Sequence, residues 1–397
     1  MATRGSRSAV AWHRCQRRLN LDGMDRSLSN ECIELAMLGS VINTEKENAR
    51  MEVTILGIDI AKNVFRLHGC DSYGKVRLRK QLGRRQLLVF LANLPKCLVA
   101  MEACATSHYW AREIGKLGHE IRLIGPNFVK PYVKANKNDA SDAEAICEAA
   151  SRPSMRFVAV KTAAQQDVQA IHRVRQQLVK VRTALVNQAR GLLAEYGIVI
   201  PQGVARLRRA LPQLLEHPDD ELSGIMREVV GEIAERLKFI EERLHQYNLR
   251  LQRLVRQDER CQRLMKVEGV GPLAATALVA AVGNASEFRS GRELAAYLGL
   301  VPRHRASGGR TVLLGISKRG DRYLRTLLVH GARSALRTID RKPSADAVWP
   351  TRIKARRGNN VAAVALANKN ARVLWALLTK GTNYRRTASP ARVPQAG

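Results

Sequence analysis

Four carboxylates in the first half of the chain have the character and spacing of metal ligands. Asp59 interrupts the apolar run of GIDIAKN, and Glu102 lies near the end of the equally apolar LVAMEACA. A carboxylate among buried residues is costly to desolvate unless it has a partner or a metal ion. Asp139 and Asp142 are three residues apart in NKNDASDAEAI, so on a helix they share one face, where like charges repel. Such oxygen ligands suit Mg²⁺ or Mn²⁺, and two such ions could activate a nucleophile and stabilise the leaving oxygen of a phosphodiester.

Each of these acids also has a simpler interpretation. A lone aspartate at the end of a strand commonly caps a turn, and Asp139 or Asp142 could be the N-cap of a helix that runs to Ala150. The sequence GID also occurs in actin-like ATPases and sugar kinases, which cradle nucleotide phosphates. Here, however, Ala61 and Lys62 follow it, and no later DxGxG-type loop appears. All four acids fall within one α/β segment, and this grouping favours the metal site.

A serine in the second half of the chain could act as a nucleophile. Ser307 lies between Ala306 and Gly308 in PRHRASGGRTVLLGISKRGDRYLR, which has the charge and flexibility to close over a sugar–phosphate backbone. A serine hydroxyl needs a base or a metal ion for such an attack, and the neighbouring sequence contains no evident base. By its context alone Ser307 is therefore more typical of a turn, and Ser317 in ISKRG is a competing candidate.

Basic residues around this serine could hold nucleic acid. Arg303, Arg305 and Arg310 could neutralise charge on a pentavalent phosphate transition state. Lys318 and Arg319 add positive charge to the same stretch, and we expect them to contact nucleic acid as well.

Two glycines at the start of the C-terminal segment suggest a further phosphate contact. In VEGVGPLAATALVAAVG, Gly269 and Gly271 precede Pro272, which favours the first turn of a helix. A helix-hairpin-helix element of this form aims backbone N–H groups at a phosphate without reading bases. An ordinary tight turn between two helices is the alternative.

Residues 53–151 alternate between strand and helix patterns and should position the carboxylates. Three early strands are predicted by TILGIDI, VFRLHGCD and KVRLRKQL, with a turn at residues 71–74. Two further buried strands are predicted by KCLVAMEACA and HEIRLIGP, and two helices by RRQLLVFLANL and SHYWAREIGKLG. This order predicts an α/β sheet with an antiparallel edge.

A long helical arm is predicted next. Apolar residues recur mostly at spacings of three and four from Ile171 to Leu192, and a 4-3 alternation runs from Met226 to Leu254. This coiled-coil spacing predicts an antiparallel hairpin within the chain or a seam between subunits, and ordinary bundle packing explains it equally well. The connection between the two helices is marked by Pro201, Gly203, Pro212 and Pro218.

These patterns divide the chain into five parts. Residues 1–50 lack sustained apolar periodicity and a signal-peptide core, so we expect a disordered or over-extended leader, with a short helix at 30–38 as the alternative. An α/β catalytic domain follows at 51–155, then the arm at 160–260. A mostly helical domain spans 264–380, and a disordered basic tail spans 381–397.

The composition limits the partners. The 397 residues include 67 Lys and Arg against 35 Asp and Glu, a net charge of +32, which predicts a polyanionic partner and most commonly nucleic acid. No run approaches eighteen apolar residues, so no membrane span is expected. The 7 cysteines include no CxxC pair, which argues against a zinc finger or a disulfide framework and favours a reducing cytoplasm.

Two blocks of this sequence together resemble a known family of DNA enzymes. GIDIAKNVF, LVAMEAC and KNDASDAEAI resemble the DEDD transposases of insertion sequences, whose catalytic domain is similar to the RuvC Holliday-junction resolvases. The C-terminal segment from VEGVGP to LLVHGA resembles the second domain of that family, so the resemblance covers nearly everything from residue 51 to about 380. The leader departs from it, because members usually begin near the first strand.

The resemblance implies roles for individual residues. It implies an RNase H/RuvC-like first domain in which Asp59, Glu102, Asp139 and Asp142 bind Mg²⁺. It also places a conserved serine at Ser307, which would attack the scissile phosphate and form a covalent link to DNA. The two domains would meet in a composite active site.

The resemblance implies partners as well. A structured RNA encoded by the element would pair with donor and target DNA, and the arm would join subunits into a homo-oligomer. We therefore expect a transposase or recombinase in the bacterial cytoplasm, associated with the nucleoid. Two rival interpretations are a Holliday-junction-type endonuclease, which would activate water and not need Ser307, and a non-catalytic nucleic-acid-binding protein.

Overall fold

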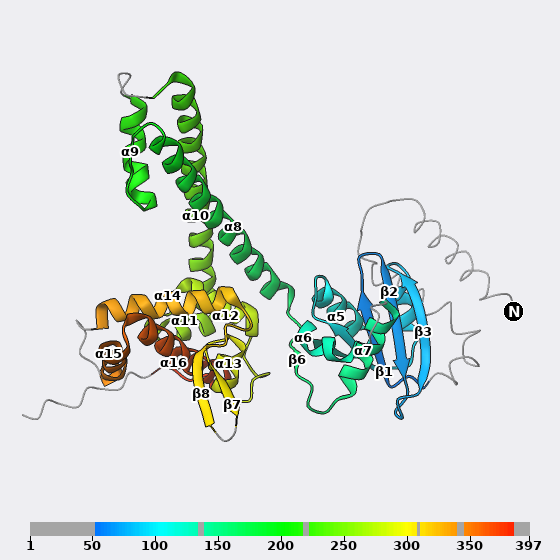
Figure 1. Ribbon diagram of the computed structural model, residues 1–397. Helices are drawn as coiled ribbons and strands as arrows, with labels where there is room; N and C mark the ends of the chain where they lie inside the picture. Colours follow the sequence, from blue (N-terminus) through cyan, green and yellow to red (C-terminus); the bar gives the residue numbers. More distant parts are fainter. Residues whose placement is uncertain (1–51, 134–138, 217–221, 308–309, 340–344, 385–397) are drawn as a thin grey trace, which may run out of the picture. The chain divides into compact units, whose positions relative to one another are not determined.

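The computed structural model describes residues 52–133, 139–216, 222–307, 310–339 and 345–384. The expected leader at 1–50 and its alternative helix lie outside the described residues, as does the part of the expected 381–397 tail from residue 385 onward. The chain forms two compact units, one that ends at Thr162 and one that starts at Ala163 (Figure 1). The helical arm therefore belongs to the same compact unit as the C-terminal helices.

The first unit is built on a six-stranded mixed sheet with the order β3-β2-β1-β4-β5-β6 (Figure 1). The first three strands are antiparallel, β1 pairs parallel with β4 and β4 with β5, and β6 is antiparallel to β5. This is the α/β sheet with an antiparallel edge that the sequence predicted. The strands are β1 (Ile55–Ile60), β2 (Val64–Cys70), β3 (Val76–Gly83), β4 (Leu98–Glu102), β5 (Glu120–Ile124) and β6 (Phe157–Val158).

Helices cover both faces of this sheet. On one face, α4 (Leu87–Ala92) and α5 (Ser107–Lys116) bury apolar side chains against Ile58 and Met101. On the other face, the helix α7 (Asp139–Ser151) packs against β1 and β4. The short helices α6 (Pro126–Val129) and η1 (Lys130–Tyr132) follow β5.

Two long helices form the arm. In the second unit, α8 (Ala163–Ala194) packs alongside α10 (Gly224–Gln257), so the chain forms the antiparallel hairpin by itself (Figure 1). The sequence predicted only a connection between them, but a helix with Pro212 inside it, α9 (Val204–Glu216), occupies that stretch. The buried residues of α10 follow the predicted stripe and include Val230, Ile233, Leu237, Ile240, Leu244 and Leu251.

The rest of the second unit is mostly helical, as predicted, but it also holds a two-stranded ribbon. β7 (Pro302–Ser307) and β8 (Arg310–Ile316) pair antiparallel where the sequence indicated a flexible loop. Every residue of β7 is exposed, so its sequence has no need of the apolar alternation that reveals a strand. The helices are α11 (Glu259–Met265), α12 (Pro272–Val282), α13 (Gly291–Tyr297), α14 (Arg322–Thr338), α15 (Ala345–Arg357) and α16 (Asn359–Lys380).

One helix among the described residues, α16, is long and apolar enough to cross a membrane by length and composition. Its Ala363, Ala367 and Leu374 are fully buried in the core that it forms with α12, α13 and α14. This packing accounts for its apolar sequence.

Candidate active site

Asp59 and Glu102 lie on neighbouring strands of the sheet. β1 and β4 run parallel with Ile58 opposite Met101, so the next step of the register places Asp59 beside Glu102. Ile58 and Met101 are buried on the side of α4 and α5. Because side chains alternate along a strand, Asp59 and Glu102 face the other side, which α7 covers. Both acids are partly buried.

The helix α7 approaches that side of the sheet at Gly57. A Cβ atom on Gly57 would collide with the backbone oxygen of Ala143 and would lie 2.7 Å from the backbone nitrogen of Cys147. Gly57 shares a strand face with Asp59, and Asp142 directly precedes Ala143. The close approach that glycine permits therefore brings the helix that carries Asp142 onto the face of the sheet that carries Asp59 and Glu102.

The donor chemistry of these acids fits a divalent metal ion. Asp59, Glu102 and Asp142 offer the carboxylate oxygens that Mg²⁺ and Mn²⁺ prefer. Among the side chains that the structure describes, no three potential ligands lie close enough together to hold an ion. α7 begins at Asp139, one turn before Asp142, but the side chain of Asp139 lies outside the described residues.

The pKa of the Cys104 thiol is affected by the charges of two of the acids. Burial raises the pKa of the Cys104 thiol, and the negative charges of Glu102 and Asp59 raise it further. Their shared effect on one thiol indicates that both carboxylates lie at the same end of the sheet. The raised pKa also keeps Cys104 protonated at neutral pH, so it is a poor nucleophile.

Ser307 is exposed at the end of β7, in the second unit. The ribbon register pairs it directly with Arg310, and Arg305 lies two residues earlier on the same face. Arg303 lies beside a register shift between Pro302 and His304. Arg303, Arg305 and Arg310 are all exposed, so the ribbon presents the Ser307 hydroxyl among several cationic side chains.

The competing candidate Ser317 lies directly after β8, in a different environment. Its backbone N–H donates to the Val301 oxygen at 2.8 Å. Its Oγ is buried and has no hydrogen-bond partner among the described residues. The two serines therefore differ in access, since only Ser307 of the pair presents an exposed side chain.

Lys318 and Arg319 are exposed on a tight turn that other segments hold in place. The Lys318 N–H donates to the Gly299 oxygen at 3.1 Å, with Lys318 itself at a φ of 55°. Arg325 Nη1 donates to the carbonyl oxygens of Leu298 at 3.0 Å and Arg319 at 3.1 Å. The backbone beneath these two cationic side chains is thus braced by the end of α13 and the start of α14.

Gly269 and Gly271 lie in the turn between α11 and α12. Gly269 has a φ of 81°, and a Cβ there would lie 2.6 Å from the backbone oxygen of Gly331 on α14. The packing of α14 is therefore sufficient reason for glycine at this position. Gly271 precedes Pro272, and no atom lies within 4 Å of its Cβ position. Of the two glycines, Gly271 is therefore the one with open space beside it.

A buried polar network connects the arm to this region. Thr276 Oγ1 donates to the Pro272 oxygen at 2.6 Å, so it accepts from His172 Nε2 at 3.0 Å. His172 Nδ1 is then free to accept from the Tyr323 hydroxyl at 2.9 Å. Burial, assisted by the charge of Arg175, lowers the pKa of His172 to about 4, which keeps the ring neutral.

The sequence did not indicate this network. The partners of His172 lie 104 and 151 residues away, and a single histidine within a helix carries no spacing signal. The network ties α8 to the first turn of α12 and to the start of α14, beside the turn that carries Lys318 and Arg319. These hydrogen bonds thus connect the arm to two segments that we predict to bind nucleic acid, the start of α12 and the turn before α14.

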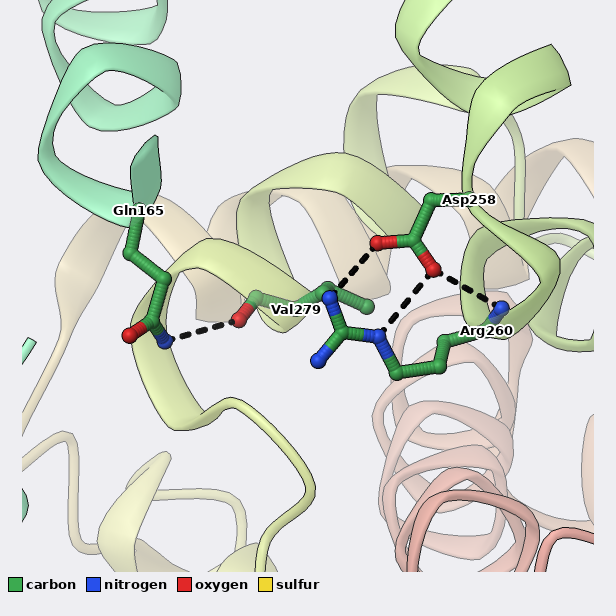
Figure 2. Close-up of polar contacts among 4 residues, drawn as sticks. All are labelled: Gln165, Asp258, Arg260 and Val279. Carbon is green, nitrogen blue, oxygen red and sulfur yellow. Dashed lines mark hydrogen bonds and ion pairs between the residues drawn. The ribbon is translucent and has the colours of Figure 1, made fainter. Parts of the chain in front are cut away.

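Two further contacts fix the joint between the arm and the C-terminal helices (Figure 2). Gln165 Nε2 of α8 donates to the Val279 oxygen of α12 at 3.4 Å. Between α10 and α11, Arg260 donates to both carboxylate oxygens of Asp258, at 2.7 and 3.1 Å. Burial alone would raise the pKa of Asp258, but these bonds and the charge of Arg260 hold it below its ordinary value.

Comparisons with known proteins match both units. A family model for DEDD-type IS110 transposases matches residues 56–198, and the model of the IS116/IS110/IS902 transposase family matches residues 261–348. The chain is 52% identical to a probable family 20 transposase of Pseudomonas aeruginosa, over 84% of this chain and 99% of that protein. It is 46% identical to the transposase for insertion sequence element IS1111A of Coxiella burnetii, over 86% and 94% of the two chains. It is 42% identical to the transposase for IS1328 of Yersinia enterocolitica, over 84% and 98%.

Proposed function

Because the chain belongs to the IS116/IS110/IS902 transposase family, whose members cleave and transfer DNA strands, we propose that it does so by metal-assisted attack of Ser307 on DNA. The observation that carries this proposal is the placement of Asp59 and Glu102 on the sheet face that α7 covers with Asp142. The mixed sheet of the first unit supports the finer assignment of an RNase H/RuvC-like fold.

Transposases of the DEDD type generally use a divalent metal ion. We propose that Asp59, Glu102 and Asp142, together with Asp139, hold Mg²⁺ or Mn²⁺. Such an ion would supply positive charge at the scissile phosphate. The protein's own part is to hold the carboxylates on two paired strands and one closely packed helix, where Gly57 leaves room for that helix.

In the proposed first step, Ser307 Oγ attacks the scissile phosphorus. An Oγ–P bond forms as one P–O bond of the DNA backbone breaks, the serine proton passes to a base, and the leaving oxygen takes up a proton. One phosphodiester is exchanged for another, so a DNA hydroxyl can later reverse the attack and rejoin strands without another source of energy. The exposure of Ser307 supports its assignment over Ser317, whose Oγ is buried.

The surrounding charges suit this reaction. Arg305 and Arg310 share a ribbon face with Ser307 and would stabilise the added negative charge of the transition state. Arg303, Lys318 and Arg319 would bind flanking phosphates. The open first turn of α12 after Gly269 and Gly271 would offer backbone N–H groups to another phosphate.

We propose two kinds of partner besides the DNA of the element and its target. The net charge of +32 is compatible with a structured guide RNA, which the family resemblance implies. A second copy of the chain would dock on the arm, where a groove of about 510 Å³ between α8 and α10 is lined by Val181, Leu185 and Phe239. Phe239 is 57% exposed, which supports a covering partner. The assembly would act on the nucleoid in the bacterial cytoplasm.

The covalent mechanism is tested by incubating the protein with labelled DNA and Mg²⁺ and separating the products under denaturing conditions. We expect labelled DNA to migrate with the protein for the wild type and for Ser317→Ala, and to be absent from the protein band for Ser307→Ala. Cleavage that survives Ser307→Ala without an adduct would favour the Holliday-junction-type endonuclease. Recombination that survives Asp59→Asn would favour a non-catalytic nucleic-acid-binding protein.

A further inference from the structure

The C-terminal helices carry a concentrated positive charge that the proposed reaction does not use. Residues 322–384 include thirteen Lys and Arg residues, against only Asp340 and Asp346. An excess of this size on three consecutive helices exceeds what solubility requires and indicates an anionic partner. The side chains of both aspartates lie outside the described residues, whereas the cationic side chains of α15 and α16 lie within them.

The helix α15 turns an unusual set of side chains to solvent. Pro350 is buried and Ile353 packs against the core, which defines the inward face of the helix. On the outward face, Trp349, Arg352 and Arg356 follow one another at spacings of three and four. Trp349 is 41% exposed and the neighbouring Val348 is 60% exposed. A large aromatic ring thus lies between cationic side chains on a solvent-facing surface.

Cationic side chains of two helices surround this tryptophan. Lys369 of α16 places its Nζ over the indole ring, 5.6 Å from the centroid. Arg352 and Arg356 form no salt bridge with any carboxylate that the structure describes, and both are exposed. An open groove of about 330 Å³ lies at the C-terminal end of α15, on a different side of the helix, and is lined by Thr351, Lys354, Ala355, Gly358 and Asn359.

We propose that this surface, defined by Trp349, Arg352 and Arg356, binds a single-stranded segment of DNA. A base stacked on an indole must be unpaired, whereas the arginines contact the phosphates on either side of it. A surface that bound only duplex backbone would need the cations but would have no use for an exposed tryptophan.

The inference rests on the proposed function, because cleaving and rejoining strands leaves stretches of DNA unpaired. It adds a place for such a stretch on α15, an element distinct from the ribbon that carries Ser307. Holding an unpaired strand would keep it from re-annealing before it is joined.

The test measures the affinity of the full-length protein for a labelled single strand of about 20 nucleotides, for the matching duplex and for the same sequence as RNA. We expect Trp349→Ala to weaken single-strand DNA binding about tenfold, while Trp349→Phe keeps most of it and duplex binding stays unchanged. The double variant R352A/R356A should lower the slope of log affinity against log salt by about 1.4 for the single strand. R253A/R256A removes the same charge from two exposed arginines of α10 and is the matched control.

Three results would overturn the proposal. The first is an equal loss of duplex and single-strand binding in the α15 variants, which would make the surface a general phosphate contact. The second is an equal effect of the control variant, and the third is a preference of this surface for RNA. Asp59→Asn separates this inference from the proposed function, because it should slow strand cleavage severely without lowering single-strand affinity. Loss of single-strand affinity in that variant would also count against an independent surface.

Discussion

Gly57 of β1 lies against the backbone of Ala143 of α7 so closely that a Cβ atom on the glycine would collide with the alanine carbonyl oxygen. This one contact sets how near the helix with Asp142 comes to the strand with Asp59. It joins the packing of the first unit to the geometry of its acidic site.

Replacing this glycine should therefore damage both stability and activity. In Gly57→Ala the helix must shift or the strand must bend, which we expect to lower the free energy of unfolding by about 1–3 kcal/mol. Thermal unfolding and strand cleavage measure the two effects. Gly191→Ala on α8 is the control, because no atom lies within 4 Å of that Cβ position and alanine favours a helix. A wild-type melting temperature for Gly57→Ala would contradict the contact.

The carboxylates should be needed for chemistry and not for DNA binding. We expect Asp59→Asn or Glu102→Gln to slow strand cleavage about a hundredfold or more, because each removes a charged oxygen ligand. DNA affinity should be equal or higher, since each variant removes a negative charge from a basic protein. Cleavage rates and binding isotherms on the same DNA measure both. Glu113→Gln is the control and should cleave normally, because Glu113 lies on α5, which covers the opposite face of the sheet.

The ribbon arginines should contribute to both affinity and rate. Replacing Arg305 and Arg310 together by Ala should lower the slope of log affinity against log salt for duplex DNA by about 1.8, if each contacts one phosphate. The rate of adduct formation should fall as well, because the two side chains share a face with Ser307. Titrations at several salt concentrations measure the slope. An unchanged slope would show that the ribbon does not contact the DNA backbone.

The buried histidine predicts how stability depends on pH. The pKa of His172 is about 4 in the folded protein and about 6.5 in an unfolded chain. Since the folded value is the lower one, the unfolded state binds the proton first. The stabilisation is therefore fully present above pH 6.5 and is lost as the pH falls toward 4, to a total of about 3 kcal/mol.

Chemical denaturation across this pH range measures the effect. His172→Gln removes this titrating group, so the wild type should lose more stability than the variant between neutral pH and about pH 4. Burial also lowers the pKa of His108, to about 4, so the difference between the two proteins isolates the contribution of His172. Parallel pH profiles would contradict the assignment.

Much of the scaffold could be read from the sequence. The apolar runs around Asp59 and Glu102 predict buried strands because burial on both faces needs no alternation. The 4-3 spacing from Met226 to Leu254 predicts the long helix α10, since that spacing keeps one stripe on one helix face. These patterns are local, so they can be recognised in a sequence without knowing which distant residues pack against them.

Other features depend on exposure and could not be read locally. The ribbon of β7 and β8 has no buried face along β7, so its polar sequence is typical of a loop as much as of a strand. The helix α9 forms in a stretch with Pro212, where the residue type argues against a helix, and the burial of Leu207 and Leu211 outweighs that preference.

The sequence by itself determined which residues are candidates for the chemistry and which local elements hold them: Asp59 and Glu102 on strands, Asp142 on a helix and Ser307 beside two glycines. Only the tertiary structure decided that Asp59 and Glu102 turn to the face covered by α7. Side chains alternate between the two faces of a strand, but this alternation does not say which set of residues faces which helix. The tertiary structure also decided that Gly57 admits that helix and that His172 meets Tyr323 across 151 residues. Such contacts join segments far apart in the chain, so their physical cause is packing, which no local spacing encodes.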